Sequence, residues 1–106
     1  MIKTTYYIGT NDKNTLQREL DDISFIKVFD NVFKDYTLQK AQGRFTNKNG
    51  QVTFEQTFIV TTFIDDCTEA TLKTLKQIQE NCDILKEKLN QEIILVEITK
   101  PEVMFL

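Results

Sequence analysis

Few residues in this chain have side chains suited to nucleophilic or acid–base chemistry. The sequence contains no histidine, so neither a histidine-based catalytic dyad or triad nor a cysteine–histidine zinc site can form within it. Its two cysteines are Cys67, near the start of a predicted helix, and Cys82, on the apolar stripe of that helix. We interpret Cys82 as a packing residue. Cys67 is interpreted as a small residue near a helix cap, with a thiolate favoured by the helix terminus as the alternative.

The remaining candidates for proton transfer are carboxylates and phenols. No two of these carboxylates have a spacing typical of a catalytic pair, and carboxylates in such contexts are usually solvated. The sequence therefore favours a protein that is not an enzyme and that needs no cofactor and no metal. The candidates for the enzyme alternative are Asp12, Glu55, Glu92, Tyr6, Tyr7 and Tyr36.

Composition limits the classes of partner. The chain has 106 residues, a formal net charge of -3 and a pI of about 4.9. A mildly acidic chain whose only arginines are Arg18 and Arg44 is unlike a general nucleic-acid binder. No apolar run approaches the ~20 residues that a membrane span requires, and the N-terminal stretch lacks the apolar core of a signal peptide. We expect a cytoplasmic protein of a bacterium or a phage.

The periodicity of apolar residues predicts four strands and two helices. Strands are expected over 3–9, 36–45, 51–64 and 93–99, and helices over 22–35 and 65–89. The stretch 51–64 organises the others, because its alternation is apolar on both faces and predicts an interior strand. Strand 93–99 is also expected to be buried on both faces, and Asp66 with Glu69 has capping-box spacing for the second helix. The apolar stripe of that helix comprises Leu72, Leu75, Ile78, Cys82, Leu85 and Leu89.

The order of these elements predicts the fold class. Strand, helix, strand, strand, helix, strand is the ferredoxin-like α+β arrangement, a single domain over 1–106. Right-handed crossovers place both helices on one face of a four-stranded antiparallel sheet. The open face would carry Ile59 and Phe63 and would be too apolar to remain in water. We therefore expect a homo-oligomer formed through this face.

In this topology three connections meet at one end of the sheet. They are the segment 10–14, the hairpin tip 44–50 and the turn 90–92, all polar. Such a cluster could bind a small anion, with Arg44 as its clamp, although loops are polar in any case and Arg44 could instead pair with Glu55. The candidate ligand-binding residues are Thr10, Asn11, Asp12, Lys13, Arg44, Asn90, Gln91 and Glu92.

Three short motifs carry a resemblance. They are Tyr7-Ile8-Gly9, then Gly43-Arg44-Phe45 with Gly50, and the segment 90–96, NQEIILV. Together they resemble a group of small uncharacterised bacterial and mobile-element proteins with a ferredoxin-like pattern. That group reads roughly Y-x-G-L, G-x-[WY]-x-x-x-x-G and [GN]-Q-E-[SA]-V-L-[VI]; Thr10 and Phe45 depart from it. The resemblance implies a fold and no activity.

The sequence thus predicts a non-catalytic binding module. It would sense or sequester a small polar ligand, for which a nucleotide-like molecule is one option, as a homo-oligomer. One alternative is a protein-interaction inhibitor or adaptor from a phage or other mobile element, which would use the hairpin or the apolar segment 103–106. The second alternative is a ferredoxin-like dimeric enzyme.

Overall fold

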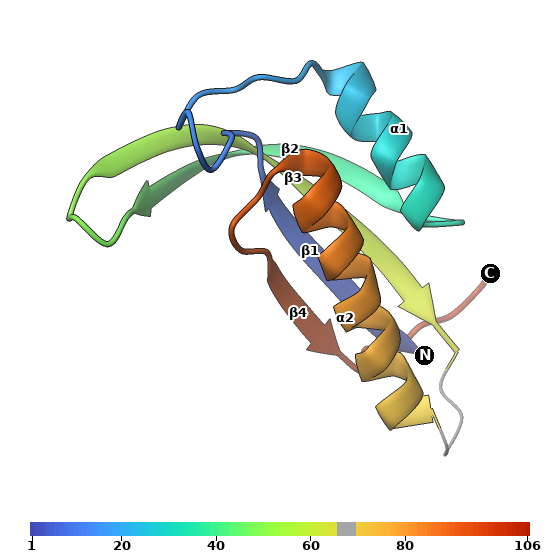
Figure 1. Cartoon of the computed structure of the whole chain (residues 1–106). Coiled ribbons are helices and arrows are strands. Elements are labelled where there is room, and N and C mark those ends of the chain that lie inside the picture. Colours follow the sequence, from blue (N-terminus) through green and yellow to red (C-terminus); the bar gives the residue numbers. More distant parts are fainter. Residues whose placement is uncertain (66–69) are drawn as a thin grey trace.

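The computed structural model describes residues 1–65 and 70–106 (Figure 1). Its elements are β1 (Ile2–Gly9), α1 (Asp22–Val32), β2 (Thr37–Thr46), β3 (Val52–Ile64), α2 (Ala70–Leu89) and β4 (Leu95–Thr99). The strands form one antiparallel sheet in the order β2-β3-β1-β4. The ferredoxin-like α+β prediction is confirmed, including the interior position of β3. The predicted capping box Asp66/Glu69 and the predicted role of Cys67 lie outside the described residues.

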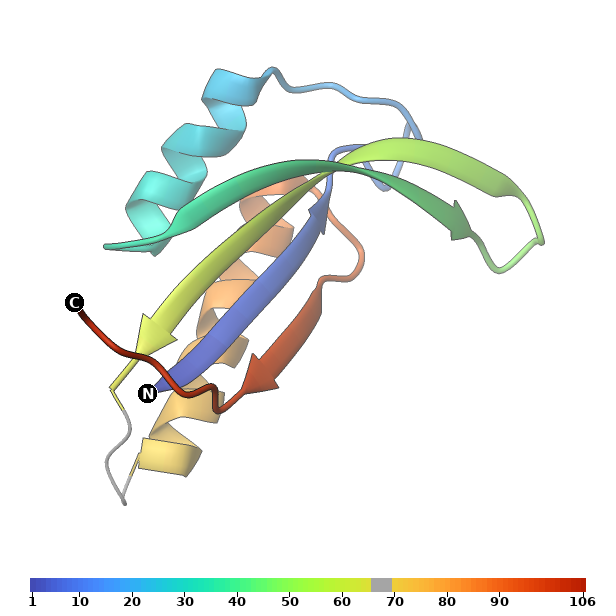
Figure 2. The ribbon, with the colours of Figure 1, turned by 180° about the vertical axis from the view of Figure 1, so that it is seen from behind.

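Both helices lie on the same face of the sheet, as the two opposite views show (Figures 1 and 2). Between helices and sheet lies the hydrophobic core, to which β1 and β3 contribute alternate residues and the helices contribute their apolar stripes. The ring of Phe58 on β3 lies 5.2 Å from Phe25 and 5.6 Å from Phe29 of α1, measured between ring centroids. Fully buried core side chains include Tyr6, Ile8, Phe25, Phe29, Phe58, Val60 and Leu85.

Local signals explain where α1 begins and ends. Asp21 is the N-cap, and its Oδ1 accepts a hydrogen bond of 2.9 Å from the Ser24 backbone N–H. The helix stops at Val32 rather than at the predicted residue 35, because Phe33 has extended backbone angles and turns its side chain into the core. Residues 15–21, which precede this helix, form an irregular loop.

Two predictions about burial are wrong. Leu75 was assigned to the buried stripe of α2, but 48% of its surface is exposed. Strand β4 begins at Leu95 rather than at residue 93 and lies at the edge of the sheet, where Leu95 is 67% exposed. On its helix-facing side Val96 is partly buried and Ile98 is 44% exposed, so the apolar residues of β4 are not buried on both faces.

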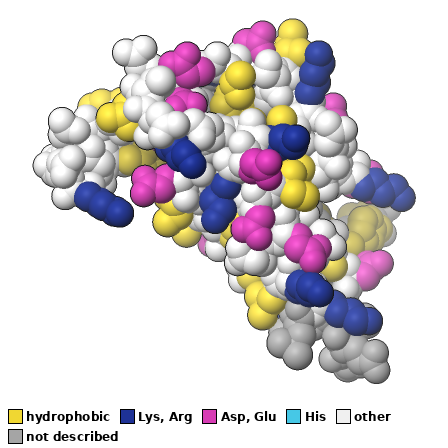
Figure 3. All heavy atoms as spheres, viewed as in Figure 1, with side chains coloured by type: hydrophobic (Ala, Val, Ile, Leu, Met, Phe, Trp, Pro, Cys, Tyr) yellow, Lys and Arg dark blue, Asp and Glu magenta, His cyan; other side chains and the backbone are white. Residues whose placement is uncertain are grey.

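The helix side of the molecule carries both signs of charge. In the space-filling view, lysine and arginine side chains are interspersed with aspartate and glutamate, and no broad field of one sign forms on this face (Figure 3). Among the described residues, no helix is long and apolar enough to cross a membrane.

Candidate functional site

The open face of the sheet, opposite the helices, contains a pocket of about 750 Å³. Beyond the ends of β1 and β4 the β2–β3 hairpin continues and curves, which gives the sheet its bent shape (Figure 2). The pocket lies where this hairpin, the β1–α1 loop and the α2–β4 connection come together. We call it the open-face pocket; the residues of its lining used below are Tyr7, Gly9, Asn11, Asp12, Lys13, Leu16, Gly43, Phe45, Glu55, Thr57, Ile59, Gln91, Glu92 and Leu95.

Glu55 is a half-buried carboxylate in this pocket. Its Oε2 accepts a hydrogen bond of 2.7 Å from the backbone N–H of Asn11, which joins β3 to the β1–α1 loop. The carboxylate lies over Gly9, where an added Cβ would come within 2.5 Å of Glu55 Oε1. Glycine at position 9 therefore makes the space that this carboxylate occupies.

A second glycine makes room for an aromatic ring. Gly43 on β2 pairs with Glu55, and an added Cβ would lie 2.3 Å from Cε2 of Phe45 and 2.8 Å from Oγ1 of Thr57. The Phe45 ring thus folds back along its own strand over Gly43, and the hydroxyl of Thr57 borders the same space. A glycine in a strand interior often marks a place where another group comes close to the backbone. At Gly43 the groups that come close are the side chains of Phe45 and Thr57.

The β1–α1 loop is held in shape by Asp12. Its Oδ1 accepts hydrogen bonds from the backbone N–H groups of Asn14 (2.8 Å) and Thr15 (3.2 Å), and its Oδ2 accepts one of 2.7 Å from the Asn90 side chain. The Asn90 bond, followed by the Asn14 bond, holds the pKa of Asp12 below its ordinary value. Leu16 ends this turn with a φ of 59°, an unusual conformation for leucine, and its exposed side chain lies at the pocket.

The α2–β4 connection supports the same loop from the other side. Asn90 follows α2 with a φ of 49°, a left-handed position that asparagine tolerates after a helix, and its carbonyl accepts a bond of 3.0 Å from the Lys13 N–H. Gln91 is buried, and its side-chain amide donates to the carbonyl oxygen of Asn11 at 2.8 Å. These residues position the loop that in turn holds Glu55.

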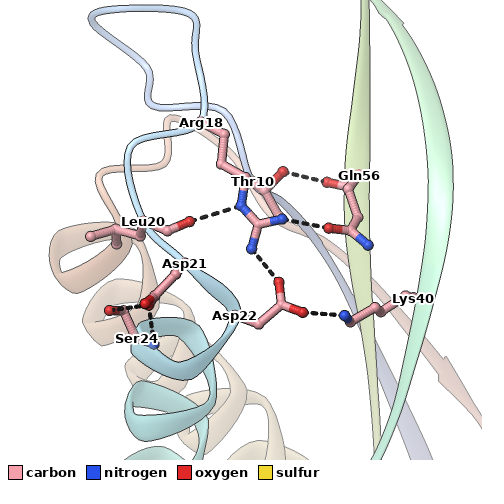
Figure 4. A network of polar contacts seen from close by, with 8 residues as sticks. All are labelled: Thr10, Arg18, Leu20, Asp21, Asp22, Ser24, Lys40 and Gln56. Atoms are coloured by element: carbon pink, nitrogen blue, oxygen red, sulfur yellow. Dashed lines mark hydrogen bonds and ion pairs between the residues drawn. The ribbon is translucent and has the colours of Figure 1, made fainter.

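Behind the pocket, a polar network ties the loop to the helix side of the sheet (Figure 4). Arg18 donates to the Leu20 carbonyl at 2.8 Å and to the Gln56 side chain at 2.5 Å, and it also pairs with Asp22. Asp22 forms a second ion pair, with Lys40 of β2. The Thr10 hydroxyl donates to the Gln56 carbonyl at 2.7 Å. Arg18, for which no role was predicted, therefore holds the path of the β1–α1 loop.

The three segments expected to converge do meet at the pocket, and Asn11, Asp12, Lys13, Gln91 and Glu92 are part of its lining. Three other candidates are not. Thr10 is buried in the network behind the loop, and Asn90 supports Asp12. Arg44 lies between Gly43 and Phe45, which both line the pocket, so alternation along β2 puts Arg44 on the opposite face. Ligand binding by these residues stays a prediction.

The charge of the pocket is opposite to the one that Arg44 would have supplied. Among the lining residues that the structure describes, Asp12, Glu55 and Glu92 are acidic and Lys13 is basic. Glu92 lies at the rim, 3.9 Å from Lys48 of the hairpin, in an exposed pair that contributes little to stability. A pocket with an excess of carboxylates favours a ligand that carries positive charge. Within 1–65 and 70–106, no cluster of three or more His, Cys, Asp or Glu residues is arranged to hold a metal ion.

The sequence reasoning missed several lining residues on the sheet. Tyr7, Phe45, Thr57 and Leu95 were not considered for ligand binding, and Glu55 was considered only for acid–base chemistry or an ion pair with Arg44. A usable signal existed, because Gly9 ends β1 and Gly43 lies within β2, the two strands that pair with β3.

Comparisons with known proteins show that solved structures share the fold of this chain. No family model and no curated protein matches the chain, so the resemblance to the uncharacterised group stays a prediction. Among the solved structures similar to this chain are two of a phage SAM lyase. The complex with S-methyl-5'-thioadenosine has a TM-score of 0.69 and 19% identity over 93% of this chain and 80% of that chain. The apo state has a TM-score of 0.73 and 17% identity over 92% of this chain and 78% of that chain.

At these identities the likeness shows the fold. It also corrects the functional prediction, because the similar structures are those of an enzyme. The prediction of a non-catalytic module that senses or sequesters its ligand is contradicted, as is the prediction that the chain is not an enzyme. The comparisons favour the enzyme alternative.

Proposed function

We propose that this chain is a lyase that cleaves S-adenosylmethionine and that the open-face pocket is its active site. The observation that carries the proposal is the Glu55 carboxylate, which is fixed by the Asn11 N–H and given room by Gly9 in a pocket with excess negative charge. S-Adenosylmethionine is a sulfonium cation with a net positive charge, and its nucleoside offers hydroxyls to a carboxylate. The fold shared with a phage SAM lyase supports the same substrate.

S-Methyl-5'-thioadenosine, the molecule bound in one of the similar structures, identifies the bond that would break. It is the thioether that remains when the sulfonium sulfur keeps the electron pair of its bond to the γ-carbon of the aminobutyrate group. If no water takes part, the aminobutyrate group can form a stable product in two ways. Its own carboxylate can attack the γ-carbon and close a lactone, or a base can remove a β-proton and leave 2-aminobut-3-enoate.

The pocket's residues have distinct tasks in either route. Apolar side chains such as Ile59 and Leu95 lower the polarity of the pocket, and closure to a lactone benefits because it neutralises two opposite charges in a medium of low polarity. The Glu55 carboxylate attracts the cation and accepts hydrogen bonds from the substrate. The elimination route would also need a carboxylate of the pocket lining as the base. Analysis of the aminobutyrate-derived product distinguishes the two routes.

The homo-oligomer is part of the same proposal. Phe63 on β3 and Leu95 on β4 are exposed on the open face, beside rows of threonines, and a second copy of the chain would cover them. Phe63→Lys, outside the pocket lining, should reduce the sedimentation coefficient to that of a monomer. A wild type that already sediments as a monomer at micromolar concentration would contradict this part.

The test of activity uses purified protein, S-adenosylmethionine and chromatography with mass detection of S-methyl-5'-thioadenosine. Wild type should form this product, and Glu55→Gln should lower the rate by about 100-fold, the usual scale for a positioned charged group. Glu87→Gln, an exposed glutamate of α2 outside the pocket, is the matched control and should retain full activity. Absence of turnover by wild type, or full activity in Glu55→Gln, would contradict the proposal.

A further inference from the structure

The hydroxyl of Thr57 has no partner among the described residues. Thr57 is only 5% exposed, and its Oγ1 is buried without a hydrogen bond. Leaving a buried hydroxyl unpaired is energetically unfavourable, so such groups are rare in folded proteins. The proposed roles of Glu55 do not use this hydroxyl.

The Thr57 side chain lies on the pocket side of the sheet. Thr57 follows Glu55 by two residues on β3, so both side chains lie on the open face, and Thr57 lines the open-face pocket. Thr57 pairs with Gly9 of the neighbouring strand β1, and its Oγ1 would lie 2.8 Å from a Cβ added at Gly43 of β2. Two residues without side chains thus lie next to it, and the half-exposed Phe45 ring and the Thr57 hydroxyl both border the space that a Cβ at Gly43 would fill.

We infer that Thr57 is a ligand-binding residue and that its hydroxyl, together with the Glu55 carboxylate, binds the ribose hydroxyls of a nucleoside; this inference rests on the proposed function. An ionised carboxylate only accepts hydrogen bonds, whereas a threonine hydroxyl both donates and accepts. Adjacent ribose hydroxyls satisfy both requirements at once. The Asn11 N–H bonds to one oxygen of Glu55, and within the described residues nothing else donates to this carboxylate. The ligand takes the place of the Phe45 ring edge beside Thr57.

A second threonine provides a matched control. Thr4 on β1 is also fully buried with an unpaired Oγ1, but it is not part of the pocket lining. Replacing either threonine with valine removes a hydroxyl and keeps the shape of the side chain. Both replacements should leave stability unchanged or raise it, because an unpaired buried hydroxyl is removed.

The experiment measures binding of S-methyl-5'-thioadenosine and of its 2',3'-dideoxy analogue by calorimetry. Thr57→Val should weaken binding of the first compound about 10-fold, the scale of one hydrogen bond, whereas Thr57→Ser and Thr4→Val should bind it as wild type does. For the dideoxy analogue, wild type and Thr57→Val should bind equally weakly. A stabilised Thr57→Val protein with reduced affinity separates this role from a structural one.

Three results would overturn the inference. Unchanged affinity of Thr57→Val for S-methyl-5'-thioadenosine would show that Thr57 does not contact the ligand. Because wild type would still bind this compound, the proposed function would not be contradicted by that result. An equal loss for both compounds would place the contact away from the ribose. If wild type binds neither S-methyl-5'-thioadenosine nor S-adenosylmethionine, the proposed function fails and the inference fails with it.

Discussion

At the scale of single residues, the site depends on the absence of a side chain at two glycines. Gly9 gives space to the Glu55 carboxylate, and Gly43 gives space to the Phe45 ring next to the Thr57 hydroxyl. Neither role requires a left-handed backbone. The glycines instead allow side chains to approach the strands closely at the open-face pocket.

Gly9→Ala tests this use of space. The added methyl group would displace the end of the Glu55 side chain and break its bond to Asn11, while the strand itself can keep its path. We expect a loss of stability of about 1 kcal/mol, the value of one hydrogen bond, together with a loss of lyase activity as large as that in Glu55→Gln. In a Glu55→Ala background, Gly9→Ala should cause no further loss of activity. Wild-type turnover by Gly9→Ala would show that the position of the carboxylate is unimportant.

The failure to place Arg44 has a physical reason at the same scale. Arg44 was chosen for its chemistry, but the face it occupies depends on the register that pairs Gly43 with Glu55. A shift of one residue in that register would reverse the face. Alternation within β3 could be read from the chain, whereas the pairing of β2 with β3 could not.

At the scale of elements, α2 supports the sheet beneath the site. Leu85 is completely buried in the core, whereas its neighbour Ile84 is 44% exposed. Leu85→Ala should lower the free energy of unfolding by about 2–5 kcal/mol, the range for an emptied leucine site. Ile84→Ala, a change of similar size in the same helix, should cost much less. Chemical denaturation measures both, and equal effects would show that α2 packs differently.

The junction of α1 and β2 predicts a dependence of stability on pH. Burial, and then the hydrogen bond of 2.6 Å that the phenol donates to Asp30, raise the pKa of Tyr36 from 10.0 to about 12. The unfolded chain therefore loses this proton first, so the stabilisation is complete below pH 10 and is lost as the pH rises through about 12. Over that window the unfolding free energy of Tyr36→Phe should fall less than that of wild type. Parallel curves would contradict the assignment.

The positions of helices and strands in the sequence were easier to predict than the burial and contacts of their residues. Periodicity located all six elements and the interior position of β3, because these depend on local alternation. It misjudged Leu75 and β4, because burial there depends on how far α2 and the sheet edge extend over each other. The unusual turn at Leu16 and the supporting bonds of Asp12, Asn90 and Gln91 connect segments distant in the chain, and no local pattern reveals them.

At the scale of the whole molecule, one face of the sheet packs against the helices, and the other carries the pocket that we propose as the active site. The helices bury the aromatic core on one side, and the curved hairpin forms the open-face pocket on the other. The ferredoxin-like fold alone fits many functions. The lyase proposal therefore depends on the acidic pocket and on Glu55, with the fold likeness to a phage SAM lyase as support.

The most direct measurement is the turnover of S-adenosylmethionine by the wild-type chain and by Glu55→Gln, with both proteins shown to be folded by circular dichroism. Our account predicts formation of S-methyl-5'-thioadenosine by wild type and a rate about 100-fold lower in Glu55→Gln. The other product should be a lactone or 2-aminobut-3-enoate. A folded wild type that leaves S-adenosylmethionine intact would contradict the account, as would a Glu55→Gln protein that cleaves it at the wild-type rate.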